Sequence, residues 1–148
     1  MLRKLLPLLF ITFFFMPITV NAEGPVTGVS HVWIREAPPG VQELAGYFTL
    51  ENFSNRPLAV VGITSPDFNS VMMYRKPQHS NRGEMEPVTT LNIPPHKSVV
   101  FAPGGSHLML IKPRKRFFDG DLVTLTLRFS DHSSLTIMAP VRRDNPQH

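Results

Sequence analysis

The stretch DLVTLTLRF, residues 121–129, carries the pattern that decides the fold class. Apolar residues at positions 123, 125, 127 and 129 alternate with polar residues at positions 124, 126 and 128. A period of two places successive side chains on opposite faces of an extended chain. The stretch therefore predicts a β-strand that buries one face and leaves the other toward solvent.

Further short segments of this style run along the chain, separated by turns rich in Pro, Gly and Asn. They occupy residues 29–35, 44–53, 58–65, 98–102, 107–111 and 134–141. No convincing helical periodicity is present after residue 22. Short strands at this spacing predict an all-β protein, built as a single-domain antiparallel β-sandwich with Greek-key connections.

The first 22 residues, MLRKLLPLLFITFFFMPITVNA, form a separate segment. They combine a positive start, an apolar stretch and a small-residue ending, which is typical of a secretory signal peptide cleaved after Ala22. A retained membrane anchor is the alternative. We expect residues 23–148 to form the exported domain, with no membrane span after processing.

Charge and cysteine content exclude several classes of protein. The chain has 15 basic and 11 acidic residues, and two of the basic ones, Arg3 and Lys4, lie in the expected signal. This small excess argues against nucleic-acid binding, so the basic run at 112–116 is expected to be a solvated loop or a docking patch. The absence of cysteine excludes disulfides, blue-copper sites, thiol catalysis and a thiol-linked lipid anchor.

No recognised catalytic motif is present. The sequence lacks the G-x-S-x-G elbow, the H-E-x-x-H zinc motif and a glycine-rich phosphate cradle. The residues therefore show no catalytic constellation, and a hydrolase with a dispersed site stays open at this point.

Methionine and histidine are concentrated in one region. Met72, Met73, Met85 and Met109 lie between residues 72 and 109, together with His79, His96 and His107. In the stretch PGGSHLMLIKP (103–113), alternation would place His107 and Met109 on the face opposite to two leucines. Thioethers are soft neutral donors that suit Cu(I). The alternative is an envelope structural or adhesion module whose methionines only fill the core.

The spacing of these residues resembles that of the PCu(A)C family of periplasmic copper chaperones. The family motif is His or Met, ten residues, Met, twenty-one residues, then His-x-Met. Here twenty-one residues separate Met85 from the His107-Leu108-Met109 triplet. The stretches VWIREAPPG (32–40), AGYFTLEN (45–52), GDLVTLTLRFSD (120–131) and TIMAPV (136–141) are also similar, so the resemblance covers about 29–141.

This resemblance implies a cupredoxin-like β-sandwich that binds Cu(I) at an exposed edge through Met85, His107 and Met109. It also implies a periplasmic carrier rather than an enzyme. The recipient in this family is usually the CuA centre of cytochrome c oxidase subunit II, often with a Sco-type thiol protein in the same pathway.

The sequence departs from the family motif at the first ligand. Ten residues lie between Tyr74 and Met85, so Tyr74 stands where the family usually has histidine. If the strand through 70–74 alternates regularly, Met72 points the same way as Tyr74 and Met73 points to the opposite face. We therefore expect Met72 to be the fourth ligand and Met73 to be a core residue. Met73 or His79 would take that place if the strand contained a bulge or the hairpin tip folded back.

Overall fold

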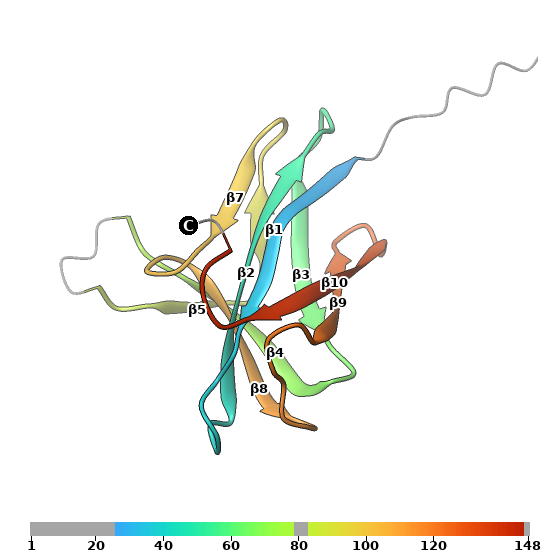
Figure 1. Ribbon diagram of the computed structural model, residues 1–148. Coiled ribbons are helices and arrows are strands. Elements are labelled where there is room, and N and C mark those ends of the chain that lie inside the picture. The colour runs from blue at the N-terminus through green and yellow to red at the C-terminus, as the bar shows by residue number, and fades with distance from the viewer. Residues whose placement is uncertain (1–25, 79–82, 147–148) are drawn as a thin grey trace, which may run out of the picture.

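The computed structural model describes residues 26–78 and 83–146. Within those ranges every regular element is a β-strand (Figure 1). They are β1 (Thr27–Arg35), β2 (Glu43–Asn52), β3 (Leu58–Thr64), β4 (Phe68–Arg75), β5 (Glu86–Val88), β6 (Leu91–Ile93), β7 (Ser98–Phe101), β8 (His107–Pro113), β9 (Leu122–Phe129) and β10 (Ser134–Arg142). The described residues include no helix long and apolar enough to cross a membrane. The expected signal, residues 1–22, lies outside these ranges.

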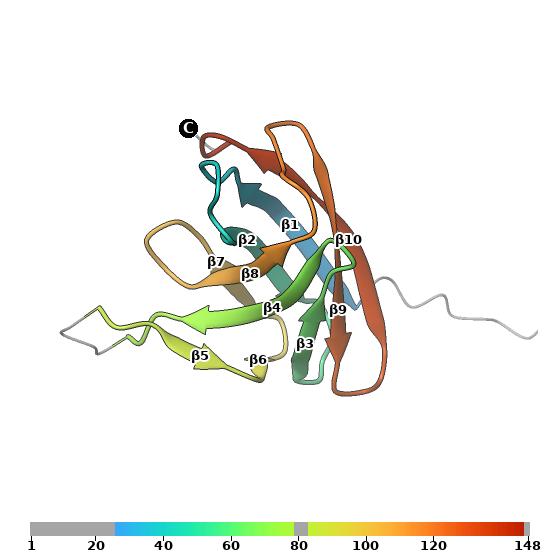
Figure 2. The same ribbon diagram turned by 90° about the horizontal axis from the view of Figure 1, so that it is seen from below.

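The strands form two sheets that are joined along one side. The first sheet has the order β5-β4-β8-β2-β1, and the second has the order β10-β9-β3-β6. Figure 2 shows the strands of both sheets arranged around the core. The all-β sandwich expected from the sequence is therefore confirmed.

One strand pair differs from the expected antiparallel arrangement. β1 and β10 run parallel, with Ile34 opposite Val141 and Arg35 opposite Arg142. These strands lie near the two ends of the described chain, so no hairpin connects them and no tight turn requires them to run in opposite directions. Their pairing joins the first sheet to the second.

The opposite side of the sandwich is nearly closed by a short connection. β5 is the last strand of the first sheet and β6 is the last strand of the second. Only Thr89 and Thr90 separate them in the sequence. The chain therefore passes directly from one sheet to the other, which gives the structure its barrel-like shape.

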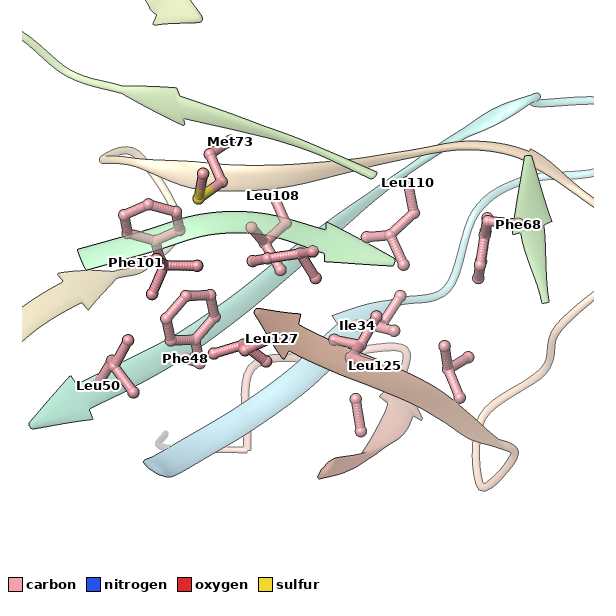
Figure 3. Close-up of a cluster of buried hydrophobic side chains, with 14 of the residues drawn as sticks. Ile34, Phe48, Leu50, Phe68, Met73, Phe101, Leu108, Leu110, Leu125 and Leu127 are labelled. Carbon is pink, nitrogen blue, oxygen red and sulfur yellow. The ribbon is translucent and has the colours of Figure 1, made fainter. Parts of the chain in front are cut away.

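Buried aliphatic and aromatic side chains from both sheets fill the space between them (Figure 3). From the stretch that predicted the fold, Val123, Leu125, Leu127 and Phe129 all belong to this core, as the alternation required. Burial of apolar surface contributes on the order of 25 cal/mol per Å², so these positions fix which face of β9 turns inward.

The side chain of Asn52 is a buried polar group at the end of β2, with 1% of its surface exposed. Its amide nitrogen donates to the carbonyl oxygens of Arg56 (2.7 Å), Ile93 (3.0 Å) and Pro94 (3.2 Å). Its oxygen accepts from the backbone N–H and the hydroxyl of Ser54. Asn52 thus ties the end of β2 to the end of β6, and its own buried amide group is fully hydrogen-bonded.

Two strands share the same edge of β2. β8 pairs with residues 43–46 of β2, whereas β7 pairs with residues 48–51. The chain between them, residues 102–106, leaves the ladder and forms a loop. In both ribbon views this loop and the described residues next to it between β4 and β5, 76–78 and 83–85, lie on the same side of the molecule (Figures 1 and 2).

Candidate metal centre

His107 and Met109 belong to the outer face of β8. Leu108 and Leu110, the residues that alternate with them, are fully buried in the core, while His107 and Met109 are half-buried. Figure 3 shows Leu108 and Leu110 among the core side chains. The alternation predicted for this strand is therefore confirmed, and it places the imidazole and the thioether on the side of the sheet that faces away from the core.

β4 lies beside β8 and adds a second methionine to the same face. The register pairs Met72 with Met109, and Tyr74 with His107. Met72 has 39% of its surface exposed, whereas Met73 has 4% exposed and packs in the core. The register is continuous from residue 70 to residue 74, so no bulge exchanges the two faces. Met73 therefore faces the core, as expected from the sequence.

Tyr74 packs against the imidazole of His107. The two rings are stacked, with centroids 5.6 Å apart and an angle of 12° between their planes. This contact restricts rotation of the imidazole. Tyr74 thus occupies the position at which the family motif has a ligand, but its ring here serves as a wall beside His107.

The backbone fixes the tautomer of His107. Its Nδ1 lies 3.2 Å from the carbonyl oxygen of Gly105. A carbonyl oxygen can only accept, so Nδ1 carries the proton and donates it. The lone pair is then on Nε2, which is the nitrogen left for a metal ion, and the hydrogen bond to Gly105 orients the ring.

The loop at 102–106 has its own internal structure. The backbone N–H of Ala102 donates to Ser106 O, and that of Gly105 donates to Ala102 O, both at 2.9 Å. Gly104 has a φ of 79°, a conformation that favours glycine because side chains with a Cβ rarely adopt it. This tight reversal delivers the Gly105 carbonyl to the imidazole.

Lys76, just beyond the end of β4, anchors this loop from outside. Its backbone N–H donates to the Ser106 hydroxyl at 3.1 Å, and its ammonium group donates to the Gly104 carbonyl at 3.1 Å. The position of the loop relative to β4 is therefore held by one residue at two points.

Met85 and His107 meet at a hollow of about 360 Å³, which we call the site hollow. Its lining also includes Ala45, Tyr47, Lys76 and Gly105. Tyr47 is buried and packs against Trp33, with ring centroids 4.7 Å apart. Met109 is paired with Ala45 in the β2–β8 ladder and so lies at the border of the hollow. The fold thus gathers Met85, His107, Met109 and Met72 on one side of one sheet.

The donor set is dominated by sulfur. Over residues 26–78 and 83–146 the structure contains no group of three or more His, Asp or Glu side chains that could hold a metal ion. A larger groove of about 740 Å³ is also lined by Lys76, and its described lining includes no methionine or histidine. One imidazole with neighbouring thioethers suits a soft monovalent ion rather than Zn²⁺ or Ca²⁺.

Met73 and His79 were the alternatives to Met72 as the fourth ligand. Met73 belongs to the core, and His79 lies outside the described residues. The role of Met72 as the fourth ligand stays a prediction, although the register places its side chain beside Met109.

Sequence reasoning missed Lys76 and Tyr47. Both were within reach of a period-two argument, because Lys76 follows Tyr74 by two residues and Tyr47 follows Ala45 by two. What the sequence could not supply was the pairing of β2 with β8, which brings Ala45 next to Met109.

Comparisons with known proteins give the family. The profile of the family described as "Putative lipoprotein LpqE-like" matches residues 27–141. "Putative lipoprotein Lxx21020" of Leifsonia xyli subsp. xyli is 30% identical over 115 residues, which cover 77% of this chain and 68% of that protein. "Uncharacterized protein RP573" of Rickettsia prowazekii is 29% identical over 107 residues, and the match spans 72% of this chain and 59% of that protein.

Solved structures share the fold and part of the sequence. The copper-bound PCuAC domain from PmoF2 superposes with a TM-score of 0.68 and 28% identity, covering 81% of this chain and 95% of that domain. The solution structure of CuI-DR1885 from Deinococcus radiodurans gives a TM-score of 0.65 and 27% identity, covering 83% of this chain and 80% of that protein. The chain therefore belongs to the LpqE-like family, and the resemblance to PCu(A)C domains predicted from its motif spacing is confirmed.

Proposed function

We propose that this protein is a periplasmic copper chaperone that binds one Cu(I) ion at the site hollow and transfers it to another protein. The observation that carries the proposal is the arrangement of His107. Its Nδ1 is engaged by Gly105, its Nε2 is left for a metal, and it shares the hollow with Met85. The ligands in this proposal are Met85, His107, Met109 and Met72.

The chemistry of these donors favours Cu(I). Thioethers bind without losing a proton and are soft, whereas Zn²⁺ in proteins is held by thiolate, imidazole and carboxylate groups. The chain has no cysteine, so its copper site cannot lose function by thiol oxidation in an oxidising compartment.

The relatives support a role in copper handling. The names of two solved structures state that the PmoF2 domain was copper-bound and that DR1885 carried Cu(I), and both are similar to this chain over most of its length. Export is supported by the signal-type segment at residues 1–22 and by a family described as lipoproteins. We propose that the exported protein is located in the periplasm.

The exposure of the ligands favours transfer over storage. Met72 is exposed, and His107, Met109 and Met85 are half-buried, so an incoming ligand from a partner can reach a bound ion. We include in the proposal the recipients implied by the family resemblance, namely the CuA centre of cytochrome c oxidase subunit II and a Sco-type thiol protein. Binding followed by ligand exchange requires no catalytic group.

The test is an anaerobic competition between the protein comprising residues 23–148 and a chromogenic Cu(I) chelator. We expect one Cu(I) ion to be withdrawn from the chelator per protein chain, and Zn(II) to bind much more weakly. Failure to compete for Cu(I), or equally tight binding of Zn(II), would contradict the proposal. The first result would favour the envelope module whose methionines only pack.

A further inference from the structure

Lys76 places a positive charge at the site hollow. Lys76 is one of the residues that line the hollow, together with Met85, Gly104 and His107. The ammonium is held there because it donates to the Gly104 carbonyl at 3.1 Å, and the next carbonyl along the chain, that of Gly105, accepts from His107. The charge is thus attached to the same two-residue segment that orients the imidazole.

No carboxylate neutralises this charge within the described residues. Lys76 forms no ion pair there, and no acidic residue is among the described residues that line the hollow. Of the two glutamates beside Met85, Glu86 pairs with Arg75 at 3.5 Å and Glu84 is exposed. The thioethers and the imidazole are neutral ligands, so they do not compensate the ammonium either.

We propose that Lys76 is a selectivity residue that favours monovalent Cu(I) over divalent ions at this site, an inference that rests on the proposed function. The repulsion between an ammonium group and a bound cation is proportional to the charge of that cation. The repulsive free energy is therefore twice as large for a divalent ion as for Cu(I). If Lys76 lowers the affinity for Cu(I) by a given factor, it therefore lowers the affinity for a divalent ion by the square of that factor.

This charge effect can be separated from the anchoring role of Lys76. Lys76→Gln removes the charge and retains an N–H donor for the Gly104 carbonyl, whereas Lys76→Arg retains the charge and changes the geometry of the donor. Lys97→Gln removes an equal charge from an exposed position outside the hollow. It serves as the matched control.

The experiment measures the dissociation constants for Cu(I), by anaerobic chelator competition, and for Zn(II) with each variant. In Lys76→Gln we expect Cu(I) affinity to rise about threefold and Zn(II) affinity to rise about tenfold, the square of the first factor. Lys76→Arg and Lys97→Gln should keep the wild-type ratio of the two affinities. Circular dichroism spectra establish that each variant is folded.

Salt gives an independent readout. Raising the ionic strength from 0.01 M to 1 M shortens the Debye length from about 30 Å to about 3 Å. The Zn(II)-to-Cu(I) affinity ratio of the wild type should then rise toward that of Lys76→Gln, while the ratio of the variant changes less.

Two outcomes would overturn the inference. One is an unchanged ratio in Lys76→Gln, and the other is an equal change in Lys76→Arg, which would assign the effect to anchoring of the loop. Either result is obtained with a wild type that binds Cu(I). Absence of Cu(I) binding by the wild type would instead refute the proposed function, so the two failures are distinguishable.

Discussion

Met72 and Met109 lie directly opposite each other in the β4–β8 ladder, on the outer face of the sheet. Neighbouring strands are about 4.8 Å apart, and opposed side chains on one face have Cβ atoms about 5 Å apart. Two flexible thioethers at that distance can bind the same ion. Met73, the next residue along β4, is excluded from this arrangement because it faces the core.

The first prediction compares the adjacent methionines. Met72→Leu should weaken Cu(I) binding at least tenfold, because a sulfur donor is lost, whereas Met73→Leu should leave the affinity nearly unchanged. Both changes conserve side-chain volume and should cost less than about 1.5 kcal/mol of unfolding free energy. Chelator competition gives the affinity and urea denaturation gives the stability.

Met138→Leu is the control for this comparison. Met138 is exposed on β10, where its sulfur accepts a hydrogen bond from Thr124 at 3.4 Å, and it belongs to the other sheet. Equal Cu(I) affinity in the Met72→Leu and Met138→Leu proteins would remove Met72 from the ligand set.

The second prediction concerns the two methionines of the family motif. Met85→Leu and Met109→Leu should each lower Cu(I) affinity strongly while the fold and the unfolding midpoint stay close to the wild type. Neither residue belongs to the buried core, so the variants lose a donor without opening a cavity. Normal copper binding by both variants would show that these methionines are not ligands.

The third prediction restores the usual residue of the family at position 74. Tyr74→His would place a second imidazole beside His107, at the position where the tyrosine ring now stacks. Cu(I) affinity should rise, and Cu(II) should be retained better, because imidazole suits both oxidation states. Titration with Cu(II) monitored by electron paramagnetic resonance tests the second point. No gain for either ion would mean that the ring at position 74 cannot reach the metal.

A fourth prediction follows from the hydrogen bond between His107 and Gly105. In the metal-free protein the imidazole should be the Nδ1–H tautomer when neutral, because the Gly105 carbonyl can only accept. Long-range ¹H–¹⁵N correlation spectra at alkaline pH distinguish the two ring nitrogens. A dominant Nε2–H form would contradict the orientation described above.

The fifth prediction concerns stability away from the metal centre. Asn52→Ala should lower the unfolding free energy by more than about 2 kcal/mol, because several hydrogen bonds disappear, among them the buried one to the Ile93 carbonyl. Asn55→Ala is the matched comparison, since its bond to His96 is exposed and its loss should cost about 1 kcal/mol or less. Denaturant midpoints with unchanged slopes measure both. Similar losses in the two variants would refute the role given to Asn52.

The alternation at 121–129 and 107–111 was sufficient to predict two strands and the inward face of each. This prediction succeeds because successive side chains in a strand point to opposite faces of the sheet. β5 and β6 were not predicted, since three residues are too few for a period to be visible. Their position depends on tertiary contacts that local sequence does not encode.

The residues of the candidate metal centre could be proposed from the sequence, whereas their surroundings could not. The spacing of Met85, His107 and Met109 pointed to one site, and regular alternation separated Met72 from Met73. The stacking of Tyr74 on His107 and the contact between Lys76 and the Gly104 carbonyl depend on the register of β4 against β8. Register is a relation between two segments, so a single segment does not reveal it.

The interruption between β7 and β8 has a consequence for how this protein can evolve. Because residues 102–106 leave the ladder at the edge of β2, insertions or substitutions there need not shift the pairing of Leu108 and Leu110 with β2. If the chain binds copper as proposed, mutations in this loop can therefore change metal preference and partner choice while the core stays the same. The loop at 102–106 can thus change in sequence without a change in the β-sandwich that carries it.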